Sequence, residues 1–272
     1  MLTSEFTKIY SSTLIPISTS GQITSHPLSS FPHLSSHSTI TNPISSFNEG
    51  LLSSTPLGLD LTLIRDSVFD EDDLDWFSLF PEEIRPEDCM ILSGSGASST
   101  FHRDPFEWTG TSLLLQGEKI WRFIKSTPKI EQLLEMESVV SEAWGDLDVS
   151  AGYQSPHTLY KRVDSFLPAT FTPTPSSGSD LRPDLNLDVE CYEVLQKPGD
   201  IIIIPKDWIH QTYSINDTIS CASQRCGIGD VKSVLGHMAE RVGVELNIEE
   251  EFEYDDAEGI LGRVFESFGI EY

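Results

Sequence analysis

The sequence has few basic residues. Seventeen Lys and Arg stand against 43 Asp and Glu, which gives a formal net charge of -26 at pH 7 in a chain of 272 residues. This balance argues against nucleic-acid binding through the overall electrostatic field. The same field would favour a basic protein or peptide partner, although a charge of this size also serves simple solubility.

Cysteines and long apolar runs are also scarce. The four cysteines form no CxxC pair and stand near no His-x3-His pattern, which argues against a structural zinc site and against a disulfide framework. No run of about 18 apolar residues occurs, so we expect no membrane span. The Ser/Thr-rich N-terminus is a poor secretory signal. These absences predict an intracellular protein, cytoplasmic or nuclear, with organelle targeting left open.

Composition divides the chain into three parts. Residues 1–58 repeat Ser, Thr, Pro and His with almost no charge, which is typical either of a disordered tail or of extended structure packed loosely against a domain. Residues 59–228 carry short apolar runs between turn residues, with an irregular Pro/Ser/Gly-rich insertion at 127–187. Residues 229–272 have helical spacing and include the acidic stretch 248–258.

The middle part is predicted to be rich in short strands. Apolar or alternating runs, bounded by Gly, Pro, Asn and Asp, occur within 89–106, 112–124, 189–195, 201–204, 208–215 and 218–224. Many short strands joined by tight turns and flanked by helices favour a mainly β fold, a sandwich or a barrel.

Two segments carry residues that could bind a metal. If residues 100–104 are extended, His102 and Asp104 point to one face and Arg103 points to the other. His210 follows the buried run Ile201–Ile204 and a Pro-Lys-Asp turn. Two histidines and one carboxylate, with the other coordination positions free, suit non-haem iron(II) and oxygen chemistry.

Lys119 is the third chemically unusual residue. On a strand it shares a face with Trp121 and Phe123, and an ammonium group on such an inward face is costly without an anionic partner. A bound dicarboxylate would be such a partner. The alternative is that Lys119 reaches solvent from the strand end.

Together these segments resemble the JmjC family of iron(II)- and 2-oxoglutarate-dependent oxygenases. The resemblance rests on GSGASSTFHRDPFEWTGTSLLLQGEKIWRFI (94–124) and LQKPGDIIIIPKDWIHQTYSINDTISCASQ (195–224), and it covers roughly residues 68–228. HxD alone is a weak signal. HxDP followed by GxKxW, and then PGD, an apolar strand and W-x-H, is a strong one. The resemblance implies a double-stranded β-helix core of the cupin or jelly-roll type with flanking α-helices.

The resemblance also implies roles for single residues. His102, Asp104 and His210 would bind iron(II), and Lys119 would pair with the far carboxylate of 2-oxoglutarate. Ser99, Ser112 and Ser223 stand where relatives carry a Thr, an Asn and a Thr around this cosubstrate. Ala222 is the alternative to Ser223 in that alignment.

The activity implied is a 2-oxoglutarate-dependent dioxygenase that releases succinate and carbon dioxide. We favour hydroxylation of a protein or peptide side chain, since the sequence shows none of the reader or zinc modules of many chromatin demethylases. N-methyl-lysine demethylation is the alternative within the family. A catalytically inactive cupin-like metal-binding module and a zinc-dependent hydrolase are alternatives of other classes. The C-terminal helices are candidate homodimer contacts.

Overall fold

A computed structural model describes most of the predicted domain. The described residues are 8, 10–19, 22–39, 42–49, 51–52, 67–69, 74–99, 102–128, 191–206, 208–243 and 257–270. The predicted insertion and the acidic stretch lie outside this part of the chain, apart from residues 127–128 and 257–258.

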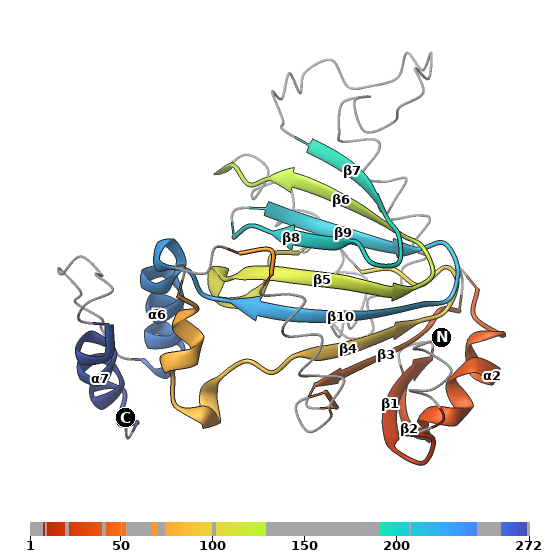
Figure 1. The fold of residues 1–272 in the computed structure, drawn as a ribbon, viewed down its shortest axis with the longest axis horizontal. Helices are drawn as coiled ribbons and strands as arrows, with labels where there is room; N and C mark the ends of the chain where they lie inside the picture. The colour runs from red at the N-terminus through yellow and green to blue at the C-terminus, as the bar shows by residue number, and fades with distance from the viewer. Residues whose placement is uncertain are drawn as a thin grey trace, which may run out of the picture.

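The strands form two antiparallel sheets, which confirms the predicted mainly β fold with a double-stranded β-helix core (Figure 1). The larger sheet has the order β2-β1-β3-β4-β10-β5-β8, and the smaller has the order β7-β6-β9. The strand bounds are β1 Leu14–Thr19, β2 Gln22–Pro27, β3 Ile44–Glu49, β4 Cys89–Ser93, β5 Thr109–Gln116, β6 Lys119–Lys125, β7 Cys191–Gln196, β8 Ile201–Ile204, β9 Trp208–Ser214 and β10 Thr218–Arg225.

Tight turns carry the chain from one sheet to the other. β5 passes to β6, β7 to β8 and β9 to β10, and each of these connections joins a strand of one sheet to a strand of the other. Gly117, between β5 and β6, has a φ of 84°, and a β-carbon there would overlap the carbonyl oxygen of Asp217. The Gln-Gly turn expected from the sequence therefore requires glycine for both conformation and space.

The two faces of the larger sheet differ in chemistry because side chains alternate along each strand. The outer face packs against the N-terminal segment in a core that includes Ile15, Ile17, Leu28, Phe31, Met90, Leu92, Leu113 and Cys221. The inner face, toward the smaller sheet, carries smaller and more polar side chains, among them Ser112, Ser220 and Ala222. The fold therefore has an apolar core outside the barrel and a polar interior within it.

The N-terminal segment takes part in the sheet. The described part of residues 1–58 includes β1, β2, a 3-10 turn at Leu28–Ser30, α2 at Phe31–Ser35, and β3. β3 pairs with β4 from Ser45 opposite Ser93 to Glu49 opposite Cys89. Of the two alternatives left by the sequence, these residues follow the second, extended structure packed against the domain.

The two C-terminal helices lie at one end of the strands (Figure 1). α6 (Ile228–Val242) and α7 (Ala257–Ser267) pack with a 3-10 helix at Trp76–Leu79 around one buried cluster. Its members include Trp76, Phe77, Phe80, Val231, Val234, Leu235, Leu261, Val264 and Phe265. Two further 3-10 helices lie at Glu82–Ile84 and Pro105–Glu107. Within residues 229–272 the structure describes α6 and α7. None of the described helices is both long and apolar enough to cross a membrane.

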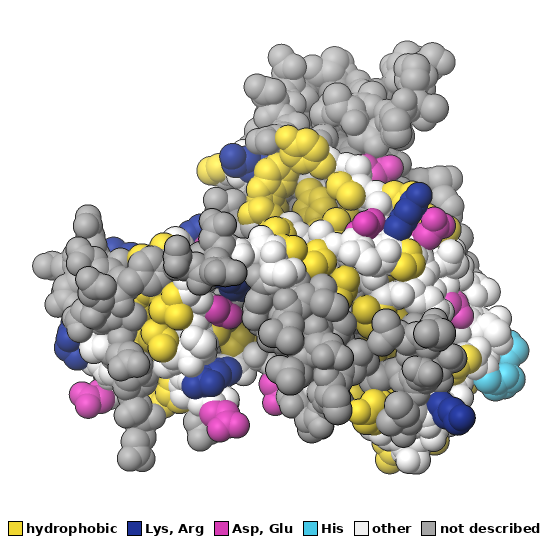
Figure 2. Space-filling model, in the orientation of Figure 1, with side chains coloured by type: hydrophobic (Ala, Val, Ile, Leu, Met, Phe, Trp, Pro, Cys, Tyr) yellow, Lys and Arg dark blue, Asp and Glu magenta, His cyan; other side chains and the backbone are white. Residues whose placement is uncertain are grey.

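Apolar side chains also reach the surface. Tyr192, Val194 and Leu195 of β7 and Ile203 of β8 are large hydrophobic residues with more than a third of their area exposed. In Figure 2, hydrophobic side chains gather over the upper part of the molecule, where Figure 1 places β7.

Asp217 connects the N-terminal segment to the barrel. Its Oδ2 accepts a hydrogen bond from Ser35 Oγ at 2.6 Å, and its Oδ1 accepts one from the Ser95 amide at 3.0 Å. We expect Asp217→Ala to lower the free energy of unfolding by about 1–3 kcal/mol, because both donors lose a charged acceptor. Urea denaturation measures this. Glu240→Ala, which removes an exposed carboxylate from α6, should change the value by less than about 0.5 kcal/mol; equal effects of the two variants would contradict the assigned role.

Candidate metal centre

Main-chain pairing brings the two metal-binding segments together. The segment that leads to His102 runs antiparallel to β9, with bridges at Ser98–Tyr213 and His102–His210. The His102 amide donates to the His210 carbonyl at 3.0 Å, and the His210 amide donates to the His102 carbonyl at 2.8 Å. Two residues 108 positions apart in the chain are therefore direct partners in a β ladder, and their imidazole rings lie 4.3 Å apart by centroid.

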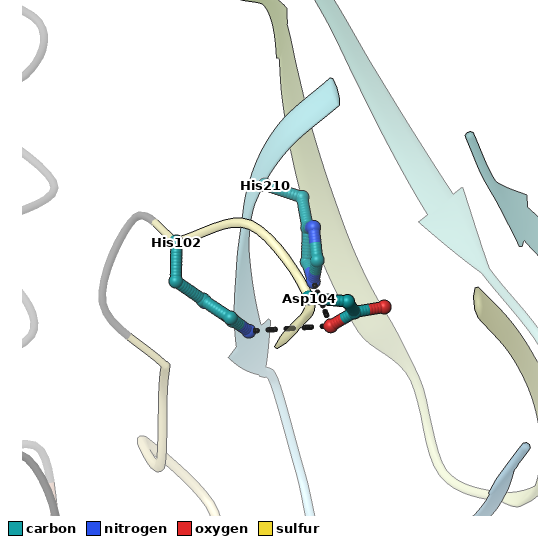
Figure 3. Close-up of side chains that lie close together, drawn as sticks. All are labelled: His102, Asp104 and His210. Atoms are coloured by element: carbon teal, nitrogen blue, oxygen red, sulfur yellow. Dashed lines mark ion pairs between the residues drawn. The ribbon is translucent and has the colours of Figure 1, made fainter. Parts of the chain in front are cut away.

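The three predicted ligands meet around one point (Figure 3). Asp104 Oδ1 lies 3.9 Å from His102 Nε2 and 3.7 Å from His210 Nε2. Both distances exceed a hydrogen bond. A cation bound at about 2.1 Å holds its ligands roughly 3–4 Å apart, so the spacing fits one shared ion. In the described part of the chain no fourth His, Cys, Asp or Glu joins this cluster.

Aromatic residues of β6 hold His210 in place. Trp121 and Phe123 stack at an interplanar angle of 5°, and the His210 ring lies 5.7 Å from Trp121 and 6.1 Å from Phe123 by centroid. Trp121 Nε1 donates to Gln196 Oε1 at 2.7 Å, and Gln196 Nε2 donates to the Ser112 carbonyl at 2.7 Å. A fully buried glutamine thus fixes the indole against which His210 packs.

Burial sets the protonation of the ligands. It lowers the pKa of His210 to about 3, with a smaller contribution from nearby His102. His210 is therefore a neutral imidazole at ordinary pH, the form that binds a metal. Burial raises the pKa of Asp104, and His102 opposes this shift. A bound cation would favour the ionised carboxylate and thereby offset the cost of burying it.

A cavity of about 970 Å3 opens between the two sheets beside the triad. Lys119 and Thr212 line it and belong to β6 and β9. Phe47, Phe106 and Trp108 bring aromatic surface to the same cavity. Phe47 is 55% exposed whereas Lys119 is 3% exposed, so the cavity runs from the protein surface to a buried ammonium group.

Lys119 is buried beside a hydroxyl group. Its Nζ donates to Ser220 Oγ at 3.0 Å and lies 6.0 Å from the centroid of the Trp121 ring. In the part of the chain that the structure describes, no carboxylate pairs with it. Burial lowers its pKa to about 8. The alternative in which Lys119 reaches solvent is wrong, because the side chain points between the sheets and is almost wholly enclosed.

The three predicted serines differ in their positions. Ser99 Oγ accepts hydrogen bonds from the Thr212 amide at 2.9 Å and from Thr212 Oγ1 at 3.2 Å. Ser112 Oγ borders the cavity, is buried, and has no hydrogen-bond partner among the described residues. Ser223 also borders the cavity, but its hydroxyl is engaged with Thr111 Oγ1 at 3.2 Å.

The sequence predicted Ser223 as the late-strand hydroxyl near the cosubstrate. In the structure the hydroxyl of β10 that contacts Lys119 belongs to Ser220. Ser220 and Ala222 share the inner face of β10, and Ser223 belongs to the opposite face. The position of Ser220 was missed, although counting back from Ala222 by two residues along the strand would have found it. Thr212 was also missed, although it lies two residues after His210 on the same face of β9 and the same count along the strand would have found it.

The remaining described histidines lie elsewhere. His33 and His37, near α2, are exposed, and their rings lie 5.2 Å apart by centroid. His26 bonds to Thr24 Oγ1, and His237 Nδ1 lies 2.9 Å from the Ser233 carbonyl of its own helix. His157 falls outside the described residues.

Comparison with known proteins gives the same assignment as the geometry. The family model described as "JmjC domain, hydroxylase" matches residues 90–224, about half of the chain. This chain belongs to the JmjC family. The matched range contains all three ligands and strands of both sheets, and it begins after β3.

Two curated JmjC relatives carry the same name in different organisms. The chain is 26% identical over 148 residues to the mouse protein "2-oxoglutarate and iron-dependent oxygenase JMJD4" and 24% identical over 150 residues to the chicken protein of that name. Each alignment covers 54% of this chain and 28% of the relative. The chain therefore matches less than a third of the length of these relatives.

The burial of Lys119 leads to a testable change in stability. At pH 7 the folded protein carries the full cost of enclosing this charge. Between pH 8 and the ordinary value of 10.5 the unfolded chain holds more protons than the folded one, so the free energy of unfolding rises with pH. We expect Lys119→Met to be more stable than the parent by about 1–3 kcal/mol at pH 7. Above pH 8 this advantage should shrink.

Urea denaturation at pH 7 and pH 9.5 would measure both effects. Lys232→Met, at an exposed position of α6, is the matched control and should change the free energy of unfolding by less than about 0.5 kcal/mol at either pH. If Lys119→Met is no more stable than the Lys232 variant at pH 7, burial of the Lys119 ammonium does not lower the free energy of unfolding.

Proposed function

We propose that this JmjC chain binds iron(II) and 2-oxoglutarate and uses them to hydroxylate a side chain of a protein or peptide. The observation that carries the proposal is the convergence of His102, Asp104 and His210 at one end of a cavity that also contains a buried lysine with no carboxylate partner among the described residues. The names of the mouse and chicken relatives, both iron-dependent oxygenases, support the same conclusion.

The donor set suits the proposed metal. Two imidazoles and one carboxylate would hold the ion and leave its remaining coordination positions for a chelating cosubstrate and for oxygen. When bound, iron(II) and 2-oxoglutarate supply an oxidative decarboxylation that yields succinate and carbon dioxide and places one oxygen atom in a substrate C–H bond. The protein's task is to hold the ligands, to orient both substrates and to limit the access of water.

The inner end of the cavity suits the cosubstrate. The Lys119 ammonium needs an anion, and the far carboxylate of 2-oxoglutarate would provide it. The sequence assigned Ser223 to the surroundings of 2-oxoglutarate. We propose Ser220 for this role instead, because its hydroxyl contacts Lys119. Ser112 Oγ, which lacks a partner among the described residues, is a second donor for the ligand. Ser99 orients Thr212 through their shared hydrogen bonds.

The outer end of the cavity suits a peptide substrate. Phe47, Phe106 and Trp108 offer apolar contact surface, and the net charge of -26 would attract a basic partner from solution. The absence of nucleic-acid binding, the homodimer through the C-terminal helices and the cytoplasmic or nuclear location stay predictions.

The direct test of activity is cosubstrate turnover. The purified full chain with iron(II), ascorbate, 2-oxoglutarate and oxygen should form succinate. Asp104→Ala should lower the rate to the level of a protein-free control, because two imidazoles alone do not hold the ion in an open, charge-balanced site. Succinate is measured with and without a panel of basic peptides, and formaldehyde is followed in parallel.

The outcomes separate the alternatives. Peptide-dependent succinate with a peptide mass gain of one oxygen supports hydroxylation, and formaldehyde indicates demethylation. Metal binding without any turnover would leave only the inactive cupin-like module. Peptide cleavage that persists without oxygen would indicate the zinc-dependent hydrolase and refute the oxygenase.

Lys119 gives a test of the cosubstrate site that does not depend on the protein substrate. Lys119→Ala should weaken 2-oxoglutarate binding by about tenfold to hundredfold, the value of a charge-assisted hydrogen bond. Metal affinity should stay within about twofold. For the parent protein, 2-oxoglutarate affinity should be flat below pH 8 and fall by up to about tenfold per unit above it, because the ligand binds the protonated ammonium.

Anaerobic titration calorimetry with manganese(II) as the metal would measure both affinities, with Lys232→Ala as the control. Equal losses of metal affinity and 2-oxoglutarate affinity in Lys119→Ala would contradict the proposed pairing of Lys119 with the far carboxylate of 2-oxoglutarate. A pH profile shared by the parent and Lys119→Ala would do the same.

A further inference from the structure

The carboxylate of Asp104 lies against the bare backbone of Gly110. A β-carbon built at Gly110, the second residue of β5, would overlap Asp104 Oδ2. The same β-carbon would also lie 3.2 Å from Ile204 Cδ1 and 3.3 Å from Ile204 Cβ. No residue other than glycine therefore fits at this position while Asp104 keeps its place.

The contact orients the carboxylate. Oδ1 faces the two imidazoles, at 3.9 Å from His102 Nε2 and 3.7 Å from His210 Nε2. Oδ2, on the other side of the same group, is the atom that faces Gly110. The glycine thus provides the space into which the second oxygen is turned, so that a single oxygen is presented to the metal position.

The backbone beneath this contact is firmly held. Gly110 pairs with Gln224 of β10 on one side and with Ile204 of β8 on the other. Its φ is not in the left-handed region, so conformational freedom is not the reason for glycine here. The remaining reason is space next to Asp104, since strands otherwise disfavour glycine.

We propose that Gly110 is a positioning residue for the metal centre: it leaves the room that Asp104 Oδ2 occupies and so keeps Oδ1 turned toward the two imidazoles that would share a metal with it. This inference rests on the metal-binding role proposed for the triad. A carboxylate pushed from this place would either turn away from the imidazoles or swing both oxygens toward the ion. Each result would weaken the site or occupy a position that the cosubstrate needs.

The test uses cobalt(II), which reports on its own coordination through its visible absorption, with the full chain. Gly110→Ala should weaken cobalt(II) binding by about tenfold to hundredfold, the usual effect of disturbing a residue that orients a metal ligand. Its cobalt(II) spectrum should differ from that of the parent. The metal-free protein should keep its melting temperature within a few degrees, because the short Asp104 side chain can turn toward solvent when no metal is bound.

Two glycine controls separate positioning from general crowding. Gly94 is as tightly enclosed, since a β-carbon there would overlap Ser38 Cβ and lie 2.6 Å from Ser38 Oγ, but none of the nearest atoms belongs to the triad. Gly94→Ala should lower the melting temperature and leave cobalt(II) affinity and spectrum unchanged. At Gly236, within α6, a β-carbon would meet no described atom within 4 Å. Gly236→Ala should leave cobalt(II) affinity and spectrum unchanged and should not lower the melting temperature, since alanine favours a helix more than glycine does.

The double variant Asp104→Ala/Gly110→Ala keeps the proposal testable if Gly110→Ala fails to fold. Removing the carboxylate removes the overlap, so the double variant should fold, and Gly110→Ala should have no further effect on the residual cobalt(II) affinity of Asp104→Ala. A double variant that remains unfolded, or an unchanged penalty of Gly110→Ala without the carboxylate, would overturn the proposal.

The outcomes also distinguish this inference from the proposed function. A parent protein that binds no cobalt(II) would refute the metal site itself. The role of Gly110 alone would be refuted by a different result: cobalt(II) binding is lost in Asp104→Ala, whereas folded Gly110→Ala keeps the parent's cobalt(II) affinity within about twofold and the parent's spectrum.

Discussion

The metal centre depends on the pair of backbone hydrogen bonds between His102 and His210. These bonds, at 3.0 and 2.8 Å, join an irregular segment to a strand of the smaller sheet. Because partners in a β ladder project side chains in register, this pairing alone fixes the separation of the two imidazoles. Asp104 follows two residues later in extended conformation, so its carboxylate reaches the same point. A slip of one residue along β9 would turn His210 out of the barrel.

The barrel interior is polar where an ordinary sandwich would be apolar. Lys119, Ser112, Ser220 and Gln196 are all buried between the sheets, while the apolar core lies outside, between the larger sheet and the N-terminal segment. Enclosing an ammonium away from any described carboxylate works against stability. The outer core and the helical cluster around Trp76 provide the stability that allows this interior to remain open and polar.

Much of this arrangement could be predicted from the sequence, because the relevant signals are local. Strand alternation places Lys119 beside Trp121 and His102 beside Asp104, and turn residues mark where the chain crosses between sheets. The residues that were missed depend on contacts between distant segments. Ser220, and not Ser223, contacts Lys119 because the pairing of β10 with β5 decides which side chains face inward. No local pattern reveals that Gly110 meets Asp104. The N-terminal segment, which lacks charge and periodicity, is ordered by its pairing with β4.

β3 contributes to the cavity from outside the range that the JmjC family model matches. Ser45, Phe47 and Glu49 belong to this strand and line the cavity, yet they precede the range matched by the JmjC family model. Part of the cavity wall is thus supplied by a strand that lies before the range matched by the family model. A change in the first fifty residues can therefore alter the shape of this cavity without touching His102, Asp104 or His210. A protein shortened to the matched range would keep the triad and lose the part of the cavity wall that β3 provides.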